Sequence, residues 1–97
     1  MIKKYKSINE VRHEIDKIDD QLVDLISIRK DLVVEAVKHK TRDQIIDKDR
    51  IEFIITKLKK KSKSSSVSPE LLEKIWRVMI NSFIEFEEKN FDKIHRI

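Results

Sequence analysis

The sequence contains no glycine, no cysteine and a single proline, and each of these shortages excludes a class of structure. Hairpins, phosphate-binding loops and dinucleotide-binding turns rely on glycine, so its absence argues against β structure and against those nucleotide sites. Without cysteine the chain forms no disulfide, performs no thiol chemistry and lacks the usual structural zinc sites. The fold class that remains is all-α.

Metal ligands and long apolar runs are also scarce. His13, His39 and His95 are scattered without ligand spacing, so we expect no metal and no cofactor. No apolar run approaches the roughly 18 residues of a membrane span. The N-terminal residues Met-Ile-Lys-Lys-Tyr-Lys lack the apolar core of a signal peptide. We therefore expect a cytoplasmic protein that does not contact a membrane.

Charged residues make up 41% of the 97 residues and hydrophobic residues 39%, which is enough for an ordered core. A chain of this length forms one domain at most, so residues 1–97 are expected to be a single helical domain. The net charge of +4 suits a nucleic-acid surface and a small anionic substrate equally well.

The segment from Ser7 to Lys40 has the pattern of one very long helix, in which Ser7 and Glu10 form a capping-box pair. A helix of about 33 residues is roughly 50 Å long, whereas a compact monomer of this size is about 32 Å across. Its apolar stripe would overhang the globule, which predicts an intertwined homodimer. The stripe consists of Ile8, Val11, Ile15, Ile18, Leu22, Leu25, Leu32 and Ala36.

Three cations lie on or beside this apolar stripe. Arg29 falls at its centre, Lys40 also does so if the helix extends that far, and Arg12 flanks it. A guanidinium in a buried seam is costly unless it meets an anion. Arg29 alone would be explained by an acid on another helix or by an interface position. Three cations on one inward face favour a pocket for an anionic ligand.

Two shorter helices are expected after a loop or broken turn at residues 41–46. Asp47 can cap a helix from Lys48 to about Lys61, and Ser68-Pro69-Glu70 is a strong start for another that runs to about Asn90. Their inward residues are Ile51, Ile54, Ile55 and Leu58, then Leu72, Ile75, Trp76, Met79, Phe83 and Phe86, with Glu87 on the same side. Residues 59–66 form either a solvated connector with serines suited to a mobile loop, or a polybasic tether for nucleic acid or lipid.

Nearly all of the chain resembles the all-helical chorismate mutase family. The resemblance lies in Arg-x-x-Ile-Asp-x-Ile-Asp, of which Arg12 is the first residue, and in Leu-x-x-x-Arg, which ends at Arg29. Lys38-His39-Lys40, Asp47-Lys48-Asp49-Arg50 and the last helix through Glu87 continue it. The family fold implied is three helices per chain, interlaced in a homodimer with two active sites. The first helix would contribute to both sites.

The resemblance also implies roles for single residues. Arg29 and Arg50 are similar to arginines that bind the substrate carboxylates, and Arg12 to one supplied by the partner chain. Lys40 is similar to a lysine that contacts a carboxylate and the bridging ether oxygen. Asp47 corresponds to an acidic position near the ring hydroxyl of the substrate.

Glu87, Ile51 and Phe83 bear on the reaction itself. Glu87 lies where many family members have a glutamine that donates to the ether oxygen, and some have a glutamate. Ile51 replaces a glutamate that binds the ring hydroxyl, and Phe83 replaces a small serine. Both departures resemble a subgroup that includes isochorismate pyruvate lyases of salicylate biosynthesis.

The expected function is therefore chorismate mutase, which rearranges a dicarboxylate substrate without a cofactor. The alternative within the enzymes is isochorismate pyruvate lyase. An alternative of another class is a basic helical module that binds nucleic acid through residues 59–63. Buried Arg12, Arg29 and Lys40 would indicate the enzyme, whereas cations on an outer face would indicate the nucleic-acid binder.

Overall fold

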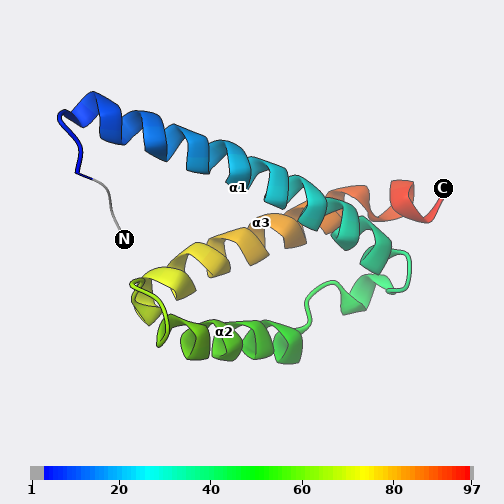
Figure 1. Ribbon diagram of the computed structural model, residues 1–97. Coiled ribbons are helices and arrows are strands. Elements are labelled where there is room, and N and C mark those ends of the chain that lie inside the picture. Colours follow the sequence, from blue (N-terminus) through cyan, green and yellow to red (C-terminus); the bar gives the residue numbers. More distant parts are fainter. Residues whose placement is uncertain (1–3, 97) are drawn as a thin grey trace. The chain divides into compact units, whose positions relative to one another are not determined.

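The computed structural model describes residues 4–96, and within that range the regular structure is entirely helical (Figure 1). Helix α1 spans Ile8–Val37, a short 3₁₀ helix η1 spans Arg42–Gln44, α2 spans Lys48–Ser62 and α3 spans Pro69–His95. The all-α prediction is thus confirmed. Met1–Lys3, which begin the basic N-terminal stretch, and Ile97 lie outside the described residues. Among residues 4–96, no helix combines the length and the hydropathy needed to cross a membrane.

The chain divides into two compact units, residues 1–32 and residues 33–97, and the boundary falls within α1. The first unit therefore holds most of α1. The second holds the last turn of α1, the connection with η1, and the two other helices. A single domain over residues 1–97 stays a prediction.

The first unit begins with a side-chain cap, as predicted. The Ser7 hydroxyl accepts a hydrogen bond from the Glu10 backbone N–H at 3.2 Å. The Glu10 carboxylate, however, accepts the backbone N–H of Lys6 rather than that of Ser7, so the reciprocal half of the capping box is shifted by one residue. Both bonds satisfy backbone donors that the start of a helix would otherwise leave unpaired.

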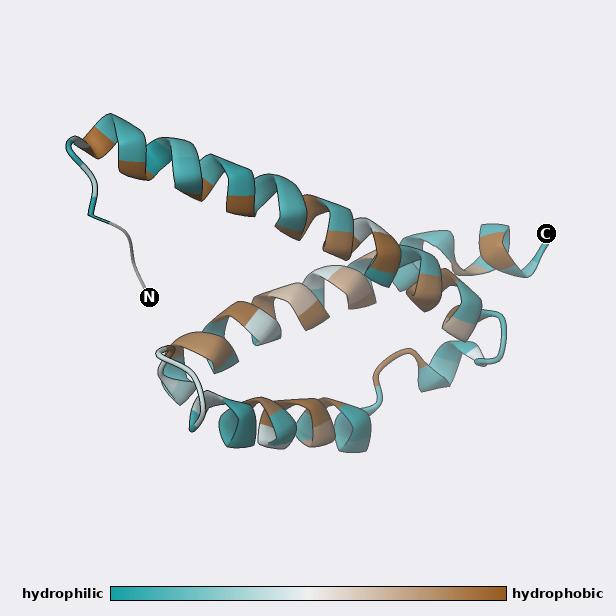
Figure 2. Cartoon of the chain, viewed as in Figure 1, coloured by the Kyte–Doolittle hydropathy of each residue, from teal (hydrophilic) through white to brown (hydrophobic). Residues whose placement is uncertain are grey.

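The predicted apolar stripe lies along one side of α1 and is exposed in the single chain (Figure 2). Exposure of its isoleucine and leucine side chains in the first unit runs from 48% at Leu22 to 65% at Leu32, whereas Val11 is half-buried. Six large side chains lie in this range: Ile8, Ile15, Ile18, Leu22, Leu25 and Leu32. A contiguous apolar stripe of this kind is typical of a helix face that a partner covers.

Helix α1 ends at Val37, three residues earlier than predicted. The backbone N–H groups of His39 and Lys40 bind the carbonyls of Ala36 and Val37, each 3.0 Å away, so the hydrogen bonds shorten from four residues to three. The prediction that Lys40 continues the stripe of α1 is therefore wrong. Lys40 belongs to the connection between α1 and η1.

Helices α2 and α3 run antiparallel and pack against each other in the second unit (Figure 1). Both predicted N-caps are confirmed: Asp47 Oδ1 accepts from the Arg50 N–H at 2.9 Å, and Ser68 Oγ accepts from the Leu71 N–H at 3.2 Å. Buried apolar side chains of the second unit are Val37, Ile45, Ile55, Ile80 and Ile94. The other predicted inward residues are half-buried, except Ile75, which is 46% exposed.

An ion-pair network joins α2 to α3. Arg77 binds Glu73 at 2.7 Å within α3 and reaches Glu52 of α2 at 3.3 Å, and Lys59 of α2 binds Glu73 at 3.2 Å. Hydrogen bonds from Arg77 and then Lys59 hold the pKa of the Glu73 carboxyl below its usual value. Lys59, the first lysine of the proposed polybasic tether, is thus directed at an acid of its own chain.

The serine-rich connection begins inside α2 rather than after it. Ser62 is buried and its hydroxyl donates to the Lys59 carbonyl at 2.6 Å. The hydroxyls of Ser64 and Ser65 donate in the same way to the carbonyls of Lys61 and Ser62. Among residues 4–96 no residue has a positive φ, so these hydroxyls bind the last carbonyls of α2 without the left-handed turn that glycine usually supplies.

Candidate active site

Two of the predicted site residues meet in the second unit. The Lys40 ammonium donates to Glu87 Oε1 at 3.0 Å, across 47 positions of sequence. The Glu87 side chain is 7% exposed and that of Lys40 is 28% exposed. A buried carboxyl oxygen is stable when it accepts a hydrogen bond, and Lys40 supplies one. The Lys40 side chain is thus partly exposed, whereas that of Glu87 is buried.

Local sequence explains why these two side chains converge. Because α1 ends at Val37, the chain turns and presents Lys40 beside α3 instead of on the continuation of α1. Glu87 lies on the buried side of α3, seven residues after the buried Ile80 and seven before the buried Ile94. A spacing of seven residues returns to nearly the same helical face. The inward position of Glu87 is thus fixed by the apolar pattern of α3.

The start of α2 carries three further predicted site residues. Asp47 and Arg50 are exposed, and Ile51 is half-buried. The Asp47 carboxylate uses Oδ1 to cap α2. The guanidinium of Arg50 lies over the ring of Phe53, 5.2 Å from its centroid, a cation–π geometry that orients the side chain.

Phe83 is half-buried on α3, one turn before Glu87. Its ring meets that of Phe86 edge to face, with centroids 6.4 Å apart and an angle of 77° between the planes. Phe83 and Glu87 are four residues apart, so they lie on the same side of α3.

Arg12 and Arg29 belong to the first unit. Arg12 is exposed and Arg29 is half-buried on α1. The two arginines and the Lys40–Glu87 pair belong to different units, so the contribution of the arginines to the site stays a prediction. The sequence analysis expected an enzyme to bury all three of these cations. Arg29 and Lys40 are half-buried, and Arg12 is exposed.

Comparison with protein families shows which family the chain belongs to. Residues 11–88 match the family model of chorismate mutase type II. The chain belongs to the chorismate mutase type II family. The matched segment begins one residue before Arg12 and ends one residue after Glu87, so it contains every predicted site residue. Searches of curated proteins and of solved structures returned no match.

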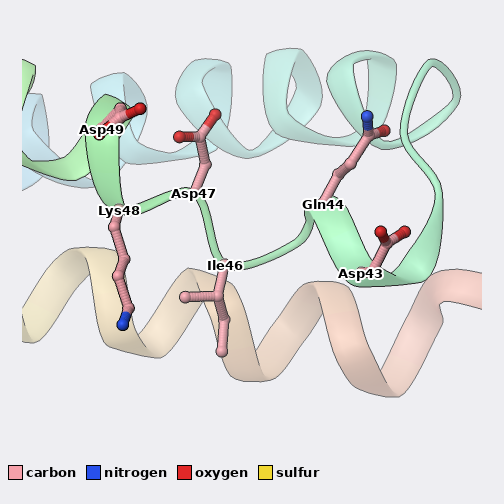
Figure 3. Close-up of a pocket in the computed structure, with 6 residues that line it drawn as sticks. All are labelled: Asp43, Gln44, Ile46, Asp47, Lys48 and Asp49. Carbon is pink, nitrogen blue, oxygen red and sulfur yellow. The ribbon is translucent and has the colours of Figure 1, made fainter.

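A hollow of about 240 Å³ lies beside the connection between η1 and α2 in this chorismate mutase family member (Figure 3). Its lining includes three carboxylates and one ammonium, and of the predicted site residues it contains only Asp47. Such a hollow does not suit a dicarboxylate, because like charges repel. The six lining residues are Asp43, Gln44, Ile46, Asp47, Lys48 and Asp49. Among residues 4–96 no cluster of side chains has the composition of a metal site.

His95 is a residue of the site region that the sequence did not single out. Its Nε2 lies 2.8 Å from the carbonyl oxygen of Val37, the carbonyl that also accepts the Lys40 backbone N–H. The signal that could have found it is spacing: Glu87, Phe91 and His95 follow one another at intervals of four residues, which places them along one side of α3.

Proposed function

We propose that the chain is a chorismate mutase that rearranges chorismate to prephenate at a site built around Lys40 and Glu87. The observation that carries the proposal is the 3.0 Å contact between the Lys40 ammonium and the buried Glu87 carboxyl, at positions that the family match includes. The reaction is a unimolecular pericyclic rearrangement, so the site needs no nucleophile and no cofactor.

The principal task of such a site is to hold the enolpyruvyl side chain over the ring in the reactive conformer. The substrate carries two carboxylates, and arginine forks bind carboxylates through two parallel hydrogen bonds. We assign this role to Arg29 and Arg50, with Arg12 supplied by a second copy of the chain. With Lys40 these residues provide four cations for a dianion, and Asp47 would lie near the ring hydroxyl.

Lys40 and Glu87 act on the bond that breaks. Negative charge grows on the ether oxygen as its bond to the ring lengthens, and a donor fixed beside it stabilises the transition state more than the ground state. Lys40 supplies such a donor. Glu87 Oε1 accepts from Lys40, so Oε2 is the oxygen through which a protonated Glu87 would donate.

Association into a homodimer would complete this site. The apolar stripe of α1 is exposed in the single chain, and Arg12 lies beside it at Val11. Covering the stripe with a second α1 would remove apolar surface from water and carry Arg12 towards the other chain. We therefore propose that the homodimer, with residues 1–97 as one domain per chain, is the active form.

Isochorismate pyruvate lyase is the second candidate, and Ile51 favours it. Ile51 follows Arg50 in the first turn of α2 and is half-buried, so an apolar surface stands where a carboxylate would bind the ring hydroxyl of chorismate. The same cations and the same pericyclic chemistry serve both substrates. The contact of Lys59 with Glu73 gives no support to the nucleic-acid alternative.

The decisive experiment is to incubate the purified protein separately with chorismate and with isochorismate, following prephenate and salicylate. We expect prephenate from chorismate, and loss of that activity in Lys40→Ala. A matched control is Lys38→Ala, because Lys38 is an exposed lysine of the same connection and pairs with Glu35. Salicylate as the main product would establish the lyase instead, and no turnover of either substrate would overturn both proposals.

A further inference from the structure

Lys40 is held at two points, and only one of them is its side chain. The ammonium binds Glu87, and the backbone N–H donates to the Val37 carbonyl at 3.0 Å. That carbonyl also lies 2.8 Å from His95 Nε2. A carbonyl oxygen only accepts, so Nε2 must carry the proton in this contact. Val37 O thus receives two donors, one from Lys40 and one from α3.

This carbonyl is one that the end of a helix leaves without a partner in the helix itself. Val37 is fully buried, at 0% exposure, so water is poorly placed to replace a lost donor. The donors provided by the chain, Lys40 N–H and His95 Nε2–H, therefore decide the orientation of this peptide group. Because the Lys40 backbone N–H is bound to the same oxygen, the orientation of the Val37 peptide group also sets the position of the Lys40 backbone.

The His95 ring has a stacking partner, although the residue is exposed. It stacks on Phe91 with centroids 4.2 Å apart and an angle of 28° between the planes. The guanidinium of Arg42 lies 4.7 Å from the centroid of the same Phe91 ring and binds Asp92 at 2.9 Å. The end of α3 is thereby joined to both sides of the connection that carries Lys40. His95 lies outside the matched segment, residues 11–88, so the family comparison assigns it nothing.

We infer that His95 is a positioning residue for Lys40: its Nε2–H fixes the Val37 carbonyl and, through it, the place of the Lys40 ammonium relative to Glu87. Glu87 and His95 hold Lys40 from two places on α3, eight residues apart. The inference rests on the proposed function for its kinetic consequence, whereas its structural consequence for Lys40 is independent of any activity.

The kinetic test compares His95→Phe, which keeps a ring to stack on Phe91 but removes the donor, with His95→Gln, which places an amide N–H at the same number of bonds from the backbone as Nε2. We expect kcat for chorismate to fall about five- to tenfold in His95→Phe, the equivalent of one hydrogen bond, with KM within about twofold. His95→Gln should recover kcat to within about twofold of the wild type.

A matched control is Asp92→Asn, which breaks the exposed ion pair with Arg42 but leaves the Val37 carbonyl untouched. We expect no change in kcat, because exposed ion pairs contribute little. A loss equal to that of His95→Phe would show that general anchoring of α3, and not the bond of His95, matters. Unchanged kcat in His95→Phe, or failure of His95→Gln to recover it, would overturn the inference.

Two further measurements keep the result decisive. If His95→Phe does not fold, His95→Asn replaces it, because its shorter amide does not reach the Val37 oxygen; equal kcat in the Asn and Gln variants would overturn the inference. If the wild type turns over neither substrate, the proposed function fails and amide hydrogen exchange of Lys40 decides. Faster exchange in His95→Phe, restored by His95→Gln, supports the link to Lys40, and unchanged exchange refutes it.

Discussion

The two units of the chain use similar residues with different results. In residues 33–97 a cation and an acid from distant positions, Lys40 and Glu87, meet beside buried apolar side chains. In residues 1–32 the cations lie along a helix whose large apolar side chains are mostly exposed. An isolated helix fixes which side chains share a face but not what covers that face. The second unit supplies its own cover, and the first requires another surface.

The largest expected effect comes from Arg29, which tests whether the first unit contributes to the site at all. Arg29→Ala should reduce kcat/KM for chorismate by a factor corresponding to about 2–5 kcal/mol, because a charge-assisted carboxylate contact is lost. Circular dichroism should be unchanged. The control is Lys30→Ala, an exposed neighbour that pairs with Asp31. Loss of helical signal in Arg29→Ala would instead make Arg29 a structural residue.

The exposed stripe provides the next test. Leu25→Glu places a charge on a face that we expect the dimer to bury, so the dimer should dissociate at micromolar concentration and turnover should fall with it. Light scattering should give nearly twice the 11.7 kDa of one chain for the wild type and one chain for the variant. Asp20→Lys, a charge change on the opposite face of α1, is the control. A monomeric wild type would contradict the homodimer.

A substitution at Ile51 tests which of the two substrates the second unit favours. Ile51→Glu should raise the ratio of mutase to lyase turnover by about tenfold or more, because the carboxylate accepts the ring hydroxyl of chorismate. A buried acid that lacks this hydroxyl is costly, so turnover of isochorismate should fall. The measurement is kcat/KM for both substrates. An equal loss of both activities would show that Ile51 serves only the packing of α2.

Glu87→Gln should have a smaller effect, a few-fold in kcat. The glutamine carbonyl can accept from Lys40 as Oε1 does, and its amide donates at every pH, whereas the acid donates only when protonated. The measurement is kcat for chorismate in the wild type and in the variant. Glu88→Gln, an exposed neighbour, is the control. Equal kcat in Glu87→Gln and Glu88→Gln would exclude Glu87 as the donor to the ether oxygen.

The smallest expected effect concerns stability. The pKa of Glu73 is lowered by its bonds to Arg77 and Lys59, so the carboxylate stabilises the fold above its usual value of 4.5, and this contribution is lost as pH falls through the lowered pKa. Glu73→Gln should lower Tm slightly at pH 7, and the two proteins should converge in acid. Thermal unfolding at both pH values checks this. The difference should be small because the Arg77 and Lys59 side chains that bind Glu73 are exposed to solvent.

Local features of the fold were predictable from the sequence, because they depend on neighbouring residues. Asp47 and Ser68 cap their helices as expected, since each side chain binds a backbone N–H three residues ahead. The end of α1 was not predictable in this way. Residues 38–40 contain no glycine or proline to mark the end of the helix, and the turn is stabilised by contacts of Val37 and Lys40 with His95 and Glu87 of α3.

The candidate site shows the same limit. The inward position of Glu87 follows from the apolar pattern of α3. Ile75 obeys that pattern too, yet it is 46% exposed, because the period alone does not say which part of a face another element covers. The role of His95 depends on a backbone carbonyl of another helix, which no pattern of side chains encodes. Arg12 and Arg29 belong to the first unit, and Arg12 is proposed to act in a second copy of the chain, so their roles stay predictions.

The serine hydroxyls that close α2 have a consequence for how this chain can change over evolutionary time. A helix boundary set by a left-handed glycine moves only when that glycine moves. Here the boundary is set by hydroxyls that bind carbonyls three residues back, at Ser62, Ser64 and Ser65. Single substitutions that add or remove a serine can therefore lengthen or shorten the connection to α3. The Lys40–Glu87 pair lies towards the other end of α3.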